Sequence, residues 1–387
     1  MSRKLFGLKF YSILVSIFYL HFCITEDCLR PMMSINSQEK NQSLEIENVV
    51  DQQRRKIKHD MENYEFLNGK YGLNISNLDD LLMEKNGRPI KSVILGNWRG
   101  GSTFVGEIVN SHPANFYHFE PLLDFGIVRI RGPPQDQPAI ANINALFNCE
   151  YNKLLSYIEY GKTNPWGFMY NPRLWEQCVS HEKICLNPLF LSEFCRLFPF
   201  QSMKILRLTL KVAQVLLKDE SFGVRMILLV RDPRGLMQSR KNPKWCQNSF
   251  DCSNTALLCN DMVSDYNIAV ELKEKYPRTF KVLRYEDLSL DPFNEAEKMF
   301  EFYGLNFHSD VKSYLETHTK NNSGGQFSTF RDSKTAPFHW RNDLNFVEVE
   351  EIQRVCATAM KLWGYVLAVN ETHQKEFNPI IKNYGPF

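Results

Sequence analysis

The chain has 387 residues, with 46 lysine and arginine residues against 44 aspartate and glutamate residues, and its formal net charge is +2. A chain of this length can form one large domain with a substantial core. Because the opposite charges nearly balance, the composition argues against a protein whose partner is a nucleic acid.

The N-terminus joins a basic start to an uncharged segment. Three basic residues within 1–9 precede the uncharged residues 10–25, and the acidic residues Glu26 and Asp27 follow. This order of charges predicts a cytoplasmic tail at 1–9 and a signal anchor at 10–25, with the rest of the chain on the luminal side. A cleaved signal peptide is the alternative, but residues 21–23, His-Phe-Cys, make a poor small-residue cleavage site.

Residues 26–87 are polar and charged and show little periodic apolar pattern. We therefore expect a luminal stem that spaces the membrane from a folded domain at 88–387, with a helical turn or two only near residues 61–67. Four glycosylation sequons fit a secretory route. They lie at Asn41, Asn74, Asn321 and Asn370.

Ten cysteines also fit an oxidising lumen, where most of the nine beyond the uncharged segment are expected to pair. Cys28, in the stem, is the natural candidate for a bridge between two copies of the chain. Cys246, Cys252 and Cys259 are spaced too widely for paired zinc ligands, so disulfides are the better interpretation.

The most informative stretch is residues 91–104, where a short apolar strand pattern ends in a glycine turn and a helical pattern begins. Such a turn directs backbone N–H groups and a helix dipole at a phosphate. The spacing and lysine of a Walker A loop are absent, so we expect a nucleotide phosphate held without a metal. The residues expected to bind it are Arg99, Gly100, Gly101, Ser102, Thr103 and Phe104.

A second strand-to-helix turn follows the apolar residues 226–230. Asp232 suits the N-cap of a helix and Pro233 its first position. Arg231 on the turn and Ser239 about two turns later are expected to bind a second phosphate. The basic residues between 225 and 244 also fit a solvated helix face. Two separate anion sites on one sheet indicate a ligand with two separated phosphates.

Further strand patterns at 114–119, 202–208 and 280–285 alternate with helical patterns. This alternation predicts an α/β fold with a mainly parallel sheet covered by helices. Ligands of such sheets bind beyond the carboxyl ends of the strands, where Glu120 is expected to stand. Glu120 is our first candidate for a catalytic base, although pairing with a neighbouring arginine explains it equally well.

His118, predicted to share a strand face with Glu120, is the second candidate base, although a role in packing or acceptor binding is favoured for it. Lys204 and Arg207 on a later strand are suited either to ligand contact or to salt bridges.

The two turn motifs together resemble the 5′- and 3′-phosphate signatures of carbohydrate sulfotransferases, most closely the Golgi 6-O-sulfotransferases. Five further segments follow in family order, and residues 328–341 resemble the loop that closes over the donor. The resemblance covers roughly residues 90 to 367. It implies a P-loop-like three-layer sulfotransferase fold with a mainly parallel central sheet flanked by helices. The five segments are 116–121, 204–208, 283–288, 340–341 and 363–365.

The resemblance also implies the activity. A sulfuryl group passes from 3′-phosphoadenosine 5′-phosphosulfate (PAPS) to the 6-hydroxyl of an N-acetylglucosamine, galactose or N-acetylgalactosamine residue in a glycan or glycosaminoglycan. Arg99 then neutralises the bridging oxygen beside the glycine loop, Arg231 and Ser239 hold the 3′-phosphate, and Glu120 removes the hydroxyl proton, without a metal. The implied location is the Golgi membrane, as a single-pass type II protein. The alternative is an inactive member of the fold that only binds glycan or nucleotide.

Overall fold

The computed structural model describes residues 26–67, 73–219, 222–320, 322–323, 325 and 328–387, with side chains from residue 39 onward. The predicted cytoplasmic tail, the signal anchor and the sequon at Asn321 lie outside the described residues. Within the described part, none of the helices combines the length and the apolar character that a bilayer crossing requires.

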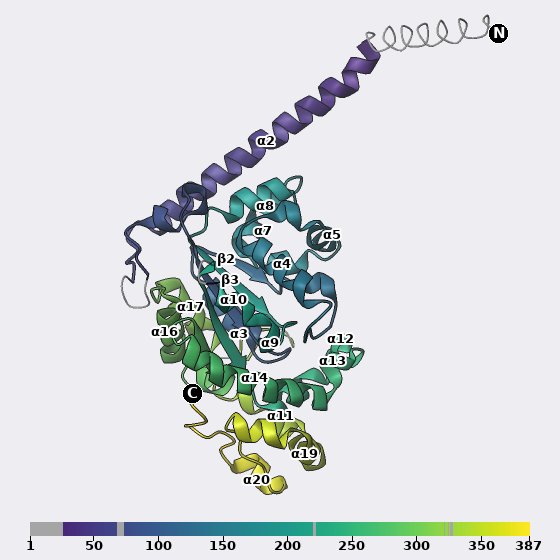
Figure 1. Ribbon diagram of the computed structural model, residues 1–387, viewed down its shortest axis with the longest axis vertical. Coiled ribbons are helices and arrows are strands. Elements are labelled where there is room, and N and C mark those ends of the chain that lie inside the picture. The colour runs from purple at the N-terminus through teal and green to yellow at the C-terminus, as the bar shows by residue number, and fades with distance from the viewer. Residues whose placement is uncertain (1–25, 68–72, 220–221, 321, 324, 326–327) are drawn as a thin grey trace, which may run out of the picture.

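Five parallel strands form one central sheet in the order β2-β3-β1-β4-β5 (Figure 1). All five expected strands are present, so the predicted α/β fold with a parallel sheet is confirmed. The strands are β1 (Ile90–Leu95), β2 (Asn115–Phe119), β3 (Phe200–Ile205), β4 (Val224–Val230) and β5 (Phe280–Arg284).

Helices fill the connections between the strands. Those before and between β1 and β4 are α2 (Glu26–Asp60), α3 (Ser102–Asn110), α4 (Asp136–Phe147), α5 (Leu155–Thr163), α6 (Trp166–Met169), α7 (Pro172–Ser180), α8 (Pro188–Cys195), α9 (Leu210–Ala213) and α10 (Val215–Lys218). Those after β4 are α11 (Pro233–Arg240), α12 (Lys244–Gln247), α13 (Phe250–Ser253), α14 (Thr255–Lys275), α15 (Tyr285–Leu290), α16 (Pro292–Tyr303), α17 (Ser309–His318), α18 (Trp340–Asp343), α19 (Phe346–Leu362) and α20 (Glu371–Glu376). Short 3₁₀ turns include η1 (Leu78–Leu81), η2 (Met83–Lys85), η3 (Leu123–Phe125), η4 (Tyr151–Lys153) and η6 (Ala336–Phe338).

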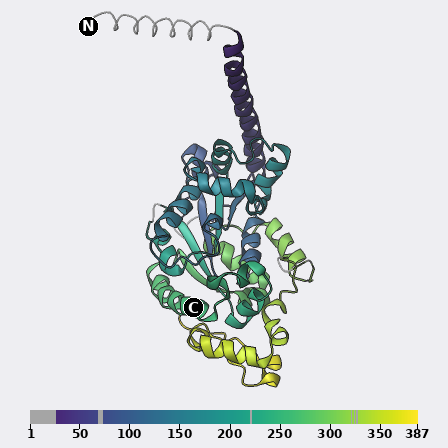
Figure 2. The same ribbon diagram turned by 90° about the vertical axis from the view of Figure 1, so that its right-hand side faces the viewer.

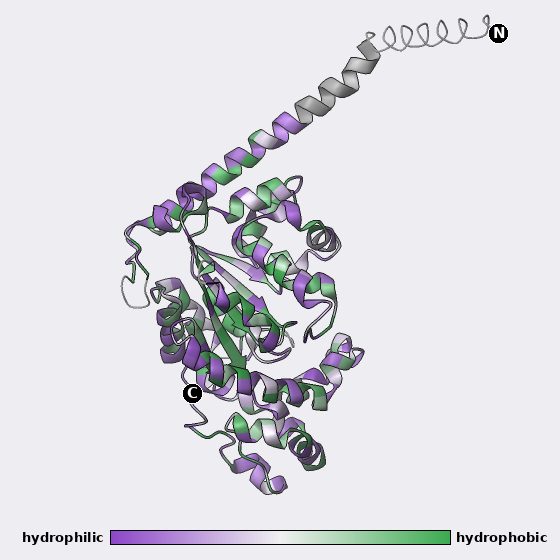
Figure 3. Cartoon of the chain, in the orientation of Figure 1, coloured by the Kyte–Doolittle hydropathy of each residue, from purple (hydrophilic) through white to green (hydrophobic). Residues whose placement is uncertain are grey.

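The core lies along the sheet. Every residue of β1 and β4 is buried, and Figure 3 shows hydrophobic colour along the central strands. Helix α3 packs against β1, β2 and β3, while α10 and α14 contact β4 and β5 respectively. Strands buried on both faces read as continuous apolar runs, which is why the sequence located them.

The expected stem contains a long helix, α2, whose first part extends away from the body of the domain (Figure 2). Ile46, Val49, Val50, Ile57 and the following Met61 are buried in the main core. The prediction of a stem with little helix is therefore wrong for the described residues. These apolar side chains recur at helical spacing, but charged neighbours hid the stripe.

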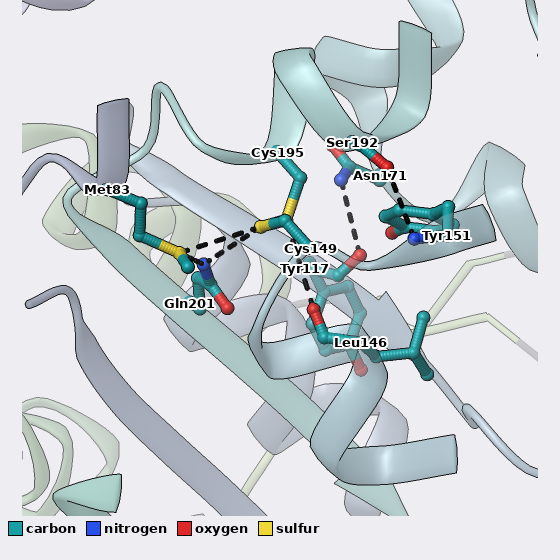
Figure 4. The surroundings of a disulfide bond; sticks show 9 residues. All are labelled: Met83, Tyr117, Leu146, Cys149, Tyr151, Asn171, Ser192, Cys195 and Gln201. Carbon is teal, nitrogen blue, oxygen red and sulfur yellow. Dashed lines mark hydrogen bonds between the residues drawn. A yellow bond between two sulfur atoms is a disulfide. The ribbon is translucent and has the colours of Figure 1, made fainter. Parts of the chain in front are cut away.

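Four disulfides join eight cysteines, so the interpretation of disulfides rather than a zinc cluster is confirmed. No group of three or more metal ligands occurs within the described part of the chain. Figure 4 shows the disulfide between Cys149 and Cys195, where Gln201 Nε2 donates to Cys149 Sγ at 3.4 Å. The side chain of Cys28 is not described, so the bridge between copies stays a prediction. The pairs are Cys149–Cys195, Cys178–Cys185, Cys246–Cys252 and Cys259–Cys356.

Candidate active site

The site lies at the carboxyl end of the sheet, where the chain changes direction. From β1 the chain runs outward to β2 and returns through β3, whereas β4 and β5 lie on the other side of β1. Adjacent loops diverge at such a switch point and leave a crevice between them. The loops after β1 and β4 carry Arg99 and Arg231, and both line a cavity of about 830 Å³.

The glycine loop leads directly into the N-terminus of α3. Gly101 is the N-cap residue at φ 86°, and among the described residues no side chain caps this end of the helix. A Cβ at Gly101 would lie 2.3 Å from the Tyr285 ring, so only glycine fits there. Ser102, Thr103 and Phe104 line the cavity beside it. This helix end is suited to an anion.

Gly100 differs from that prediction. Its N–H donates to the Asn97 carbonyl at 3.0 Å, and the residue does not line the cavity. The turn itself therefore uses the donor that we expected to bind a phosphate.

The two phosphate motifs meet in one cationic cluster. Arg99 Nε donates to Ser239 Oγ at 2.9 Å, and Arg231 donates to the Arg99 carbonyl at 2.7 Å. Burial lowers the pKa of Arg99 to about 10, and the nearby charges of Arg231 and Arg331 contribute. Neighbouring guanidinium groups repel one another, so an anion bound between them stabilises the cluster. The structure thus unites Arg99 and Ser239, which the sequence analysis assigned to two different phosphates.

Glu120 also lines the cavity, but not from the strand face that we predicted. Strand β2 ends at Phe119, and Glu120 adopts φ 45°, which turns its side chain into the cavity lined by Phe119. Its carboxylate accepts from Arg207 at 2.6 Å and pairs with Lys204 at 3.0 Å. Burial alone raises the pKa of Glu120, but these two cations outweigh it and hold the pKa below its ordinary value. The carboxylate is therefore ionised.

Lys204 connects the carboxylate to the phosphate loop. Its Nζ donates to Thr103 Oγ1 at 3.3 Å and lies 3.5 Å from the centre of the Phe119 ring. Burial lowers the pKa of Lys204, and the charge of Glu120 opposes that shift. Its position within a predicted strand was the sequence signal for Lys204, whose role the sequence left open.

His118 is not part of the cavity. It is buried between the rings of Phe116 and Phe147, at centroid distances of 5.0 and 6.2 Å. Burial lowers its pKa to about 3. The candidate base role of His118 is therefore wrong, because strand alternation points its ring into the core while Glu120 leaves the strand.

Three of the six basic residues between 225 and 244 serve the fold. Arg234 pairs with the N-cap carboxylate of Asp232 at 2.7 Å, and Arg240 donates to the Trp98 carbonyl at 3.1 Å. Arg225 donates to a backbone carbonyl of α16. These guanidinium groups are buried, so neither a solvated helix face nor an anion site describes them.

The segment that resembles a donor-covering loop does lie along the cavity. Ser328, Thr329, Arg331, Ser333 and His339 line it. The loop therefore adds hydroxyl and cationic groups to the same space as the glycine loop.

Comparison with known proteins identifies the class. Residues 89–364 match the family model described as a sulfotransferase domain, and this chain therefore belongs to the sulfotransferase domain family. The resemblance inferred from the two motifs is confirmed at this level.

Its similar relatives are carbohydrate sulfotransferases. Carbohydrate sulfotransferase 5 of Mus musculus is 24% identical over 334 residues, which cover 76% of this chain and 85% of that protein. Carbohydrate sulfotransferase 6 of Homo sapiens is 24% identical over 329 residues, which cover 73% of this chain and 82% of that protein. Among solved structures, retinol dehydratase with retinol and PAP gives a TM-score of 0.38 at 15% identity and covers 70% of this chain and 82% of that one. Mouse sulfotransferase SULT7A1 with PAP gives a TM-score of 0.36 at 10% identity, and the match covers 78% of this chain and 90% of that one.

Proposed function

We propose that this protein transfers a sulfuryl group from PAPS to the 6-hydroxyl of an N-acetylglucosamine, galactose or N-acetylgalactosamine residue. One observation carries the proposal: a single cavity joins an uncapped helix N-terminus, a cluster of guanidinium groups, and an ionised carboxylate paired with a lysine. Family membership and the names of the similar relatives support the same reaction.

In this proposal the donor is held differently from what the family resemblance implies. The N–H groups of Gly101, Ser102 and Thr103 at the start of α3 bind the 5′-phosphosulfate. Arg99 and Arg231, with the Ser239 hydroxyl, bind the 3′-phosphate, since these groups meet across the switch point. This assignment moves Arg99 away from the bridging oxygen, where the sequence analysis put it.

Lys204 neutralises the negative charge that develops on the bridging oxygen. Glu120 accepts the proton of the sugar hydroxyl as its oxygen bonds to sulfur. The bond between sulfur and the 5′-phosphate oxygen breaks, and that oxygen leaves with a negative charge beside Lys204. The products are the sugar sulfate ester and adenosine 3′,5′-bisphosphate. Because the pKa of Glu120 is held low, it accepts the proton late, after bonding to sulfur has made the hydroxyl acidic.

The proposed location is the Golgi membrane, with a type II anchor at residues 10–25 and the catalytic domain in the lumen. Four disulfides support an oxidising compartment. The sequons at Asn41, Asn74 and Asn370 are exposed, as glycosylation requires. A homodimer bridged through Cys28 is part of this proposal.

The test is transfer of ³⁵S-sulfate from labelled PAPS by the full-length chain, with EDTA present. The full chain is needed because a fragment that starts at residue 88 lacks the buried side chains of α2. Desulfated keratan, chondroitin and N-acetylglucosamine-terminated glycans serve as acceptors, and the labelled products are mapped for 6-O-sulfate. Label at position 6 supports the proposal. Tight binding of adenosine 3′,5′-bisphosphate without transfer to any acceptor contradicts it and favours the inactive alternative.

A further inference from the structure

One end of the cavity has an aromatic wall, made of Phe119, Tyr160, Trp166 and Tyr170. Phe119 and Tyr170 stack at 3.8 Å, and Phe119 meets Trp166 edge to face at 5.9 Å. Trp166 is 42% exposed. A large ring exposed in a cavity, with neighbours that fix its orientation, offers a flat apolar surface to a ligand.

The wall stands away from the donor groups. Phe119 ends β2, one of the two edge strands of the sheet. Arg99 follows β1, two strands away, and Arg231 follows β4, three strands away. Glu120 and Lys204 lie between the two ends, with Lys204 over the Phe119 ring. A sugar on the wall is thus next to the base, on the side opposite the 3′-phosphate groups.

An acidic side chain also lines the cavity. Asp124, on η3, lines the cavity, and its buried Oδ1 has no hydrogen-bond partner among the described residues. Burial raises the pKa of Asp124, and the charge of Arg207 opposes that rise, although Arg207 and Lys204 also pair with Glu120. An unpartnered carboxylate oxygen suits a sugar hydroxyl as donor and repels a second carboxylate.

We propose that the aromatic wall and Asp124 form the acceptor subsite and that this subsite selects uncharged sugars over uronic acids. The inference rests on the proposed function and deepens it. The acceptor sugar stacks on Trp166 and donates a hydroxyl to Asp124. A chain of neutral galactose and N-acetylglucosamine units fits this end, whereas a uronate next to the acceptor sugar faces the Asp124 carboxylate.

Two acceptor chains that differ only in the uronate carboxylate test the effect of that charge. Chondroitin and carboxyl-reduced chondroitin differ only at the uronate, and desulfated keratan is the neutral reference. The expected kcat/KM of the wild type is about tenfold higher for the carboxyl-reduced chain than for chondroitin. Asp124→Asn narrows this ratio towards one, whereas Glu159→Gln, at an exposed carboxylate on α5 that pairs with Lys162, leaves it unchanged.

Trp166 is tested separately on desulfated keratan. Trp166→Ala raises the acceptor KM about two- to tenfold, and Trp166→Phe retains most of the affinity because a ring remains. The KM for PAPS stays the same in both variants, because Trp166 lies at the far end of the cavity.

Three outcomes overturn the inference: equal or better use of chondroitin by the wild type, an unchanged ratio in Asp124→Asn, or an unchanged acceptor KM in Trp166→Ala. Failure to label any acceptor, keratan included, instead refutes the proposed function. The two failures are therefore distinguishable.

Discussion

Replacing Arg99 with alanine tests where the donor's 3′-phosphate binds. Arg99 Nε contacts Ser239 at 2.9 Å, and the Arg231 side chain holds the Arg99 carbonyl. If these groups bind the 3′-phosphate, Arg99→Ala weakens the binding of adenosine 3′,5′-bisphosphate. The binding of adenosine 5′-monophosphate stays nearly the same. The two nucleotides differ only in the phosphate under test.

The size of the effect follows from one lost charge-assisted hydrogen bond. Such bonds contribute about 1.5–3 kcal/mol, which is a rise of about 10- to 160-fold in Kd. The pKa of Arg99, lowered to about 10, still leaves the guanidinium charged at neutral pH, so its full charge is lost in the variant. The variant also loses the repulsion from Arg231 and Arg331, which offsets part of the stability lost with the contact to Ser239.

Isothermal titration calorimetry of both nucleotides against wild type, Arg99→Ala and Arg99→Lys provides the measurement. Lysine retains the charge but not the forked geometry, so we expect an intermediate loss. In the double variant Arg99→Ala with Ser239→Ala, the loss of binding free energy is expected to differ from the sum of the two single losses, because the two groups are in contact. Equal losses for the two nucleotides would place Arg99 at the 5′ end and refute the reasoning.

Three further predictions concern the base, a buried carboxyl group and a disulfide. Glu120→Gln lowers kcat by about 10²–10⁴-fold while the Kd for adenosine 3′,5′-bisphosphate changes little, measured by sulfate transfer and calorimetry; unchanged turnover would exclude this base. Burial raises the pKa of Glu107 to about 7, so the wild type loses stability as pH rises from about 4.5 through 7, by up to about 3 kcal/mol. Glu107→Gln lacks that loss, so in urea unfolding the variant is expected to be more stable than the wild type at pH 8 but not at pH 5. An equal difference in unfolding free energy at both pH values would contradict the raised pKa of Glu107. Replacing Cys259 and Cys356 together with alanine opens a loop of 97 residues and costs about 4–5 kcal/mol in unfolding free energy; an unchanged melting temperature would argue against the bond.

Strands β1 and β4 were predictable because each contains a short apolar run that ends at a turn, whereas β2, β3 and β5 mix apolar and polar residues. The order of the strands was not predictable, since no local pattern shows that β3 inserts between β2 and β1. That insertion brings Arg207 within 2.6 Å of Glu120, which lies 87 positions earlier. Both a pair of this kind and a free base fit the sequence equally well.

Other differences arise from single backbone choices. Alternation along β2 predicted a shared face for His118 and Glu120, but φ 45° at Glu120 ends the alternation. The contact between Arg99 and Ser239 joins residues 140 positions apart, so two motifs that look like separate sites form one. In α2 the apolar stripe was present in the sequence, but the charged residues around it dominated the composition.

Transfer of labelled sulfate tests the central claim most directly. Full-length wild type and Glu120→Gln are incubated in parallel with ³⁵S-labelled PAPS and desulfated keratan in EDTA, after both are shown to bind adenosine 3′,5′-bisphosphate with the same Kd. We predict label on the sugar 6-hydroxyl with the wild type and at least about 100-fold less with Glu120→Gln. Equal label with both proteins would contradict the role of Glu120, and no label with a wild type that binds the nucleotide would contradict the assignment of a sulfotransferase.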